Sequence, residues 1–130
     1  MRLTVQTDYA LRMLMHLAVN EGRLVTIAEV AERYDVSKNH LMKVAQALTH
    51  LGAVASVRGR NGGLALARAP QEIAIGEIVR PLERESALVE CFPNGAGECL
   101  ITPSCKLKGV LARAQEAFFA VLDEYSIHDL

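Results

Sequence analysis

The three cysteines of this 130-residue chain lie close together, at Cys91, Cys99 and Cys105 in the segment ECFPNGAGECLITPSCKLKG. An odd, tightly grouped set of cysteines in a chain without a secretory signal argues against a disulfide framework and for a metal or iron–sulfur site. Tetrahedral zinc and the common clusters take four protein ligands, so this set is one short. The fourth ligand is then a non-cysteine side chain, a group from another subunit, or a position left open to a small molecule.

Charge and hydropathy indicate the kind of partner and the compartment. Residues 1–68 hold nine Lys or Arg against five Asp or Glu, and residues 69–130 hold five against ten. A basic front half suggests that this half meets a polyanion. No apolar run approaches the roughly 20 residues of a membrane span, and Arg2, Asp8 and Arg12 interrupt the N-terminal apolar stretch, which does not read as a signal peptide. We therefore expect a cytoplasmic protein.

The first two helices that should position the basic half are marked by their caps. Thr4 can cap a helix over about residues 5–20, with apolar side chains at helical spacing: Leu11, Leu14, Met15 and Ala18. Thr26 and Glu29 have the spacing of a capping box, in which the hydroxyl and the carboxylate satisfy each other's backbone N–H groups. A short helix should therefore run from there to Tyr34.

A third helix follows Ser37, which can cap it, and stops before Gly52. Its apolar face consists of Leu41, Val44, Ala45, Leu48 and Leu51. Two short helices joined by a tight turn, with a polar and basic outer face on the second, are typical of a helix-turn-helix that reads a major groove. The residues expected at the DNA are Ser37, Lys38, Asn39, His40, Lys43 and Gln46.

The next segment, AVASVRGRNGGLALA, predicts a β-hairpin wing. Asn61 and Gly62 supply the two positive-φ positions of a tight turn, and Gly63 relaxes the return strand. Arg58 and Arg60 could approach a phosphate or a narrow minor groove from the glycine-rich tip, so they join Asn61 and Gly62 as expected DNA contacts. An αα-corner or a plain hairpin would explain each part alone, but their order and spacing favour DNA binding.

The second half should contain a linker from Pro70, a short helix that Pro81 kinks or ends, and a loop over residues 88–102. Thr102 and Pro103 then suit an N-cap and a first helical position. The last helix is apolar at 3.5-residue spacing, at Leu107, Val110, Leu111, Ala114, Ala117, Phe118, Val121, Leu122 and Tyr125. It must pack either on the body of its own chain or on a second subunit. The fold class expected is mainly α with a small β wing: a winged helix-turn-helix domain over residues 1–69, and a cysteine loop and long dimerisation helix over residues 70–130.

Taken in order, the segments TDYALR, SKNHLMKV, VRGRNGGLALA, IGEIVRPLE and ITPSCKLK resemble the NsrR and IscR (Rrf-type) family of winged-helix iron–sulfur regulators over essentially the whole chain. The segments RLTVQTDYALR, RGRNGG and CLITPSCKLK are most similar to its nitric-oxide-sensing branch. The resemblance implies a homodimeric repressor, not an enzyme, that binds palindromic double-stranded promoter DNA. It also implies nitric oxide as the signal and control of genes for nitrosative-stress defence or nitrogen-oxide metabolism.

One position separates the branches of this family. IscR-like members place a ligating histidine two residues after the third cysteine, where this chain has Leu107. In the NsrR-like pattern a carboxylate from the other subunit completes the site, and the matching residue is Asp8. The resemblance thus implies a 4Fe-4S cluster, rather than a 2Fe-2S one, on the cysteine trio and Asp8 of the partner subunit. Without it, Asp8 is simply a favourable acid in a first helical turn, and Arg12 is its (i, i+4) partner or a switch contact.

Two other functions remain open from the residues. The same DNA-binding module could sense iron–sulfur or redox status through a 2Fe-2S cluster or through thiols without metal. A small metalloenzyme or electron-transfer protein is the other class, but no acid–base or nucleophile–base constellation accompanies the cysteines.

Overall fold

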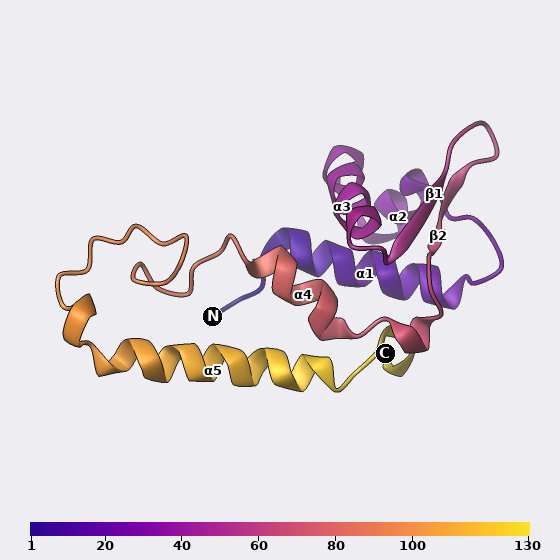
Figure 1. Cartoon of the computed structure of the whole chain (residues 1–130). Helices are drawn as coiled ribbons and strands as arrows, with labels where there is room; N and C mark the ends of the chain where they lie inside the picture. The colour runs from indigo at the N-terminus through magenta and orange to yellow at the C-terminus, as the bar shows by residue number, and fades with distance from the viewer.

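Helices α1 (Val5–Val19), α2 (Ile27–Tyr34) and α3 (Lys38–His50) open the computed structural model, which describes residues 1–130. All three begin at the predicted caps, where a hydroxyl oxygen accepts the backbone N–H three residues ahead. Asp35 ends α2 in the left-handed conformation, φ 53°, and so turns the chain into α3. α3 packs against both α2 and α1 (Figure 1), which confirms the predicted helix-turn-helix.

Strands β1 (Val54–Val57) and β2 (Gly63–Leu66) form the predicted antiparallel wing, but its turn differs from the prediction. Gly59 adopts the positive φ, 113°, whereas neither Asn61 nor Gly62 does. The loop is longer than a two-residue turn, and the Gly62 N–H closes it on the Gly59 carbonyl at 3.0 Å. Gly62 is needed for space instead, because a Cβ there would overlap a carbonyl oxygen of β1.

Val25, in the loop between α1 and α2, adds a short third partner to the wing. Its N–H donates to the Leu64 carbonyl at 2.9 Å, and the Leu64 N–H donates back at 2.7 Å. Gly63 permits this approach, since a Cβ on it would lie 2.9 Å from the Val25 carbonyl oxygen. The wing is therefore hydrogen-bonded to the segment that leads into the helix-turn-helix.

The buried face of α1 lies one residue away from the predicted one. The deeply buried apolar positions are Ala10, Met13, Leu14 and Leu17. Of the predicted set, Leu11, Met15 and Ala18 are only partly buried. α1 contacts α3, β2, a fourth helix and the C-terminal turn, so it carries apolar residues on more than one side. Spacing alone does not identify the deepest stripe of such a helix.

The second half contains η1 (Pro70–Glu72), α4 (Ile75–Glu83), η2 (Thr102–Ser104), α5 (Lys106–Asp123) and η3 (Ile127–Asp129). α4 packs on α1, and α5 packs on α4 and continues past it beneath the long loop (Figure 1). Pro81 lies in the last turn of α4, which ends two residues later. Ile78 and Ile127 belong to the same hydrophobic cluster as the core of the first three helices. The division at residues 69 and 70 thus stays a prediction.

α5 begins after Cys105 and leaves much of its apolar surface exposed. Cys105 occupies its N-cap position, and Thr102 donates its hydroxyl to the Cys99 carbonyl at 2.8 Å, so the predicted cap at Thr102 is wrong. No α5 residue is fully buried: Phe118, Phe119 and Leu122 cover the core, whereas Leu107, Val110 and Val121 remain more than half exposed. The helix ends at Asp123, so Tyr125, which is half exposed, lies beyond it and not within it as predicted. No helix of the chain combines the length and the apolar character that crossing a membrane requires.

Candidate functional site

The outer face of α3 carries the residues predicted to contact DNA. Lys38, Asn39, Lys43 and Gln46 are all exposed on it. Ser37 is exposed as well, and its hydroxyl oxygen is occupied as the cap of the helix. His40 is different, because its ring is half-buried and faces α1. The predicted contacts on α3 therefore share one accessible face, with His40 at its edge.

The wing stands next to this face. Arg58, Arg60 and Asn61 are exposed at its tip, while Gly62 contributes backbone only. An open cleft of about 520 Å³ separates α3 from the wing, with Gln46 on one wall and Arg58 on the other. Cationic and amide side chains around such a cleft suit contacts to phosphates and base edges.

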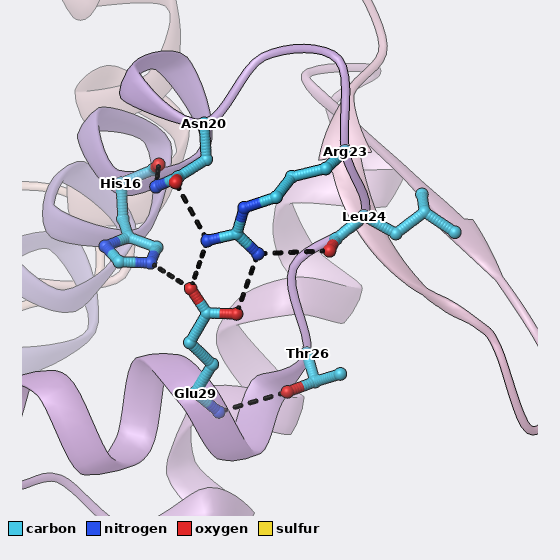
Figure 2. Close-up of polar contacts among 6 residues, drawn as sticks. All are labelled: His16, Asn20, Arg23, Leu24, Thr26 and Glu29. Atoms are coloured by element: carbon cyan, nitrogen blue, oxygen red, sulfur yellow. Dashed lines mark hydrogen bonds and ion pairs between the residues drawn. The ribbon is translucent and has the colours of Figure 1, made fainter.

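A polar network joins the end of α1, the loop that follows it and the start of α2, and it replaces the capping box predicted at Thr26 (Figure 2). The Thr26 hydroxyl accepts the Glu29 N–H at 3.1 Å, but the Glu29 carboxylate turns away to other partners. Arg23 donates to both of its oxygens, at 2.6 and 3.0 Å, and His16 Nε2 lies 3.1 Å from one of them. The hydrogen bonds from Arg23 and then His16 lower the pKa of Glu29 from 4.5 to about 2.

This network fixes the loop that reaches the wing. Arg23 also donates to Asn20 Oδ1 at 2.8 Å and to the Leu24 carbonyl at 3.4 Å, one residue before the Val25 pairing with β2. Glu29 is thus connected to the wing through Arg23 and the loop residues Leu24 and Val25. The sequence reasoning did not identify Arg23, whose side chain bonds to Asn20, Leu24 and Glu29 across the turn between α1 and α2.

The three cysteines lie in the segment between α4 and α5, and Cys105 directly precedes α5. All are free thiols of intermediate exposure. Asn94 stabilises the loop: it adopts φ 66°, and its side-chain amide donates to the Arg84 carbonyl at 2.9 Å. Cys105 lies at the N-terminus of α5, where the helix dipole favours negative charge. Free thiols in this setting have the donor chemistry that iron–sulfur clusters use.

Asp8 lies one turn into α1 and is paired within its own chain. Arg12 donates from Nε to Asp8 Oδ1 at 3.1 Å, and its Nη2 lies 2.9 Å from Oδ2. The Asp8 side chain remains 46% exposed, so it is accessible to another molecule. Within a single chain, no three His, Cys, Asp or Glu side chains are arranged to hold a metal ion. One chain therefore neither gathers the three cysteines into a metal-holding arrangement nor brings Asp8 to them.

The start of α1 is nevertheless tied to the end of α4, from which the cysteine loop departs. Glu83 Oε1 accepts the Thr4 N–H and the Thr4 hydroxyl, both at 2.9 Å, and also the Thr7 hydroxyl. Thr7 is the one fully buried polar residue. Sequence reasoning missed this contact, whose partners lie 76 and 79 positions apart.

Comparisons with known proteins give the family. The sequence model of the Rrf2 family, described as iron-dependent transcriptional regulators, matches residues 3–130. The chain belongs to the Rrf2 family. It is 48% identical to the HTH-type transcriptional regulator NsrR of Bacillus licheniformis and 49% identical to that of Bacillus subtilis (strain 168), over 100% of this chain and 92% and 90% of those proteins.

Solved structures agree with this placement. The IscR of T. potens superposes with a TM-score of 0.77 at 28% identity, covering 99% of this chain and 85% of that one. The resemblance inferred from the sequence and the predicted fold class are thereby confirmed. This Rrf2 protein is a DNA-binding transcriptional regulator and not an enzyme.

Proposed function

We propose that this Rrf2 regulator is a homodimeric repressor that senses nitric oxide through an iron–sulfur cluster, most simply of the 4Fe-4S type. The observation that carries the proposal is the set of three free thiols between α4 and the solvent-exposed part of α5. The high identity to regulators named NsrR supports nitric oxide as the signal. Genes for nitrosative-stress defence or nitrogen-oxide metabolism are the expected targets.

The ligands would be Cys91, Cys99 and Cys105 of one chain and Asp8 of the partner subunit. The thiols supply soft, anionic donors, and the α5 N-terminus favours the charge of Cys105. Asp8 is accessible, and Arg12 holds it only in a half-exposed ion pair. When bound, a cluster with one weak oxygen ligand supplies an iron at which nitric oxide can displace that ligand. Arg12 is then the contact to which Asp8 returns.

Dimerisation is supported by α5. Leu107, Val110 and Val121 expose between 54% and 60% of their surface, and a second copy of the helix would cover them. A symmetric dimer presents two α3 helices to half-sites about one helical turn apart, which fits palindromic promoter DNA. An Asp8 bond across this dimer would tie the DNA-binding module of one subunit to the cysteine loop of the other.

The experiment compares three states of the dimer. Anaerobically loaded, nitric-oxide-treated and cluster-free protein are titrated at one salt concentration with a duplex selected from a random pool, and with its scrambled sequence. Specific affinity should fall in the treated and cluster-free states much more than non-specific affinity. Equal affinity of all three states for the selected duplex would contradict the proposal.

The cofactor is tested separately. Replacing any one of the cysteines by Ala should abolish iron and sulfide incorporation while leaving helical content intact, because none of them belongs to the hydrophobic core. A normal cluster in Cys99→Ala would disprove the ligand set. An iron and sulfide content that matches a 2Fe-2S cluster would replace the 4Fe-4S assignment.

A further inference from the structure

The ring of Tyr9 packs edge-on against the imidazole of His40. The ring centroids are 4.9 Å apart and the ring planes meet at 65°. Tyr9 directly follows Asp8 on α1, and His40 belongs to the first turn of α3, where its N–H donates to the Ser37 cap. This pair is therefore a contact between the helix that carries Asp8 and the helix that faces DNA.

The position of the pair distinguishes it from the rest of the packing between α1 and α3. The core residues of these helices, such as Leu14 and Val44, are aliphatic and fully buried. Tyr9 and His40 are half-buried, so they lie at the rim, beside the exposed Lys38 and Asn39. Edge-to-face contacts between rings are directional, whereas aliphatic packing is not. A small rotation of the first turns of α1 would thus be felt at the start of α3 through this pair.

We propose that Tyr9 is a positioning residue that transmits the bonding state of Asp8 to the recognition helix through His40. The inference rests on the proposed function, because it assumes that Asp8 exchanges Arg12 for another partner. Asp8 and Tyr9 are consecutive, so a displacement that brings the Asp8 carboxylate to a new partner also moves the Tyr9 ring. The first turn of α3 would then place Lys38 and Asn39 differently on the duplex.

The effect has an expected size. An edge-to-face aromatic pair changes an equilibrium by about threefold to tenfold. Tyr9→Leu, which keeps an apolar side chain but removes the ring, should therefore reduce the ratio of loaded to cluster-free affinity for the selected duplex by about that factor. Tyr9→Phe should keep the ratio, because the contact is made by the ring.

Tyr34 offers a matched control. Its ring also packs edge-on against a histidine, His16, at 5.8 Å and 79°, but this pair joins α2 to α1 rather than to the recognition helix. Tyr34→Leu should leave the ratio at the wild-type value. Iron content and visible absorption of each loaded variant show whether the cluster itself is unchanged.

The outcomes separate the inference from the function on which it rests. A wild-type ratio of one contradicts the proposed function, and the inference with it. A large wild-type ratio that Tyr9→Leu retains overturns the inference alone. If Tyr9→Leu does not fold, the imidazole NMR resonances of the wild-type protein provide the test. The His40 resonances should shift between cluster-free and loaded protein more than the His16 resonances do. An equal or smaller shift at His40 overturns the inference.

Discussion

Glu83, the last residue of α4, bonds to the backbone N–H of Thr4, the N-cap of α1, at 2.9 Å. In a capping box this bond comes from an acid three residues after the cap. That position is Thr7, which lacks a carboxylate and itself donates to Glu83. The capping box of α1 is therefore completed by a different helix, and the first turn of α1 cannot move independently of the end of α4.

Glu83→Ala should destabilise the chain. It leaves the Thr4 N–H and the buried Thr7 hydroxyl without their acceptor, at a cost of roughly 1–3 kcal/mol in the free energy of unfolding. Urea denaturation of the cluster-free protein measures this cost. Glu85→Ala, at an exposed position nearby, is the control and should change stability little. Equal stabilities of the two variants would show that the contact contributes nothing.

Alanine substitutions at two glycines should change the stability of the protein in opposite directions. A Cβ on Gly76 would overlap the Asp123 carboxylate, which pairs with Arg80 at 2.5 Å, and would lie 3.0 Å from the Asp123 backbone nitrogen. Gly76→Ala must therefore displace this carboxylate from its pair with Arg80 and crowd the end of α5. We expect a loss of roughly 1–3 kcal/mol. A Cβ on Gly109 meets nothing within 4 Å, so Gly109→Ala should gain about 0.5–1 kcal/mol from helix propensity. Thermal unfolding distinguishes them, and a neutral Gly76→Ala would contradict the close packing.

The low pKa of Glu29 predicts a pH dependence. Because the pKa falls from 4.5 to about 2 on folding, the carboxylate contributes stability fully above pH 4.5 and loses it as the pH approaches about 2. Glu29→Gln removes this titration. The free energy of unfolding of wild type should therefore decline more steeply than that of the variant over this range. Parallel curves would mean that Glu29 is not held by Arg23 and His16 in solution.

Phosphate and base contacts should respond differently to substitution. Lys43→Gln and Arg58→Gln should weaken binding to every duplex and reduce the salt slope by about one for each phosphate that the variant no longer neutralises. Gln46→Ala should instead relax the preference at a single base pair of each half-site, at about 1–3 kcal/mol. Arg113→Gln, on α5, serves as the charge control. An unaltered slope in Arg58→Gln would exclude the wing as a phosphate contact.

Asp8→Ala should preserve dimerisation and most cluster loading. Losing the exposed pair with Arg12 costs only about 0.3–0.5 kcal/mol, so a change in the cluster could not be attributed to unfolding. The visible spectrum of the loaded protein and its reaction with nitric oxide should both change. Gln6→Ala, in the same helical turn, is the control. Unchanged spectrum and reactivity would leave Asp8 as a helix-start residue.

The sequence was sufficient for the starts of the first three helices, but not for every local feature. Thr4, Thr26 and Ser37 cap their helices as predicted, since each bonds to an N–H only three positions away. The two-residue turn predicted at Asn61 and Gly62 was wrong, because Gly59 takes the positive φ in a longer loop. The α-helix cap predicted at Thr102 was wrong, because the proline after it suits the start of a 3₁₀ turn as well as that of an α-helix.

Contacts between distant segments could not be predicted in this way. Glu29 follows Thr26 at capping-box spacing, yet its carboxylate is hydrogen-bonded to Arg23 and His16 instead. These two residues lie in the preceding loop and in α1. Glu83 carries no local sign that it caps α1. The cysteine trio was recognisable from its spacing, whereas the proposed fourth ligand, Asp8 of a partner subunit, lies on a second chain, and spacing within one chain cannot indicate it.

Arg12 binds both carboxylate oxygens of Asp8, so this carboxylate already has a cationic partner within its own chain. A ligand that binds the Asp8 carboxylate must first displace Arg12. When that ligand leaves, Arg12 is close enough to bind the carboxylate again. Releasing Asp8 from Arg12 costs little free energy, because a half-exposed ion pair is weak. Under the proposed function, Asp8 can therefore leave Arg12 and return to it at low cost. The regulator can then reset after a signal without a large structural change.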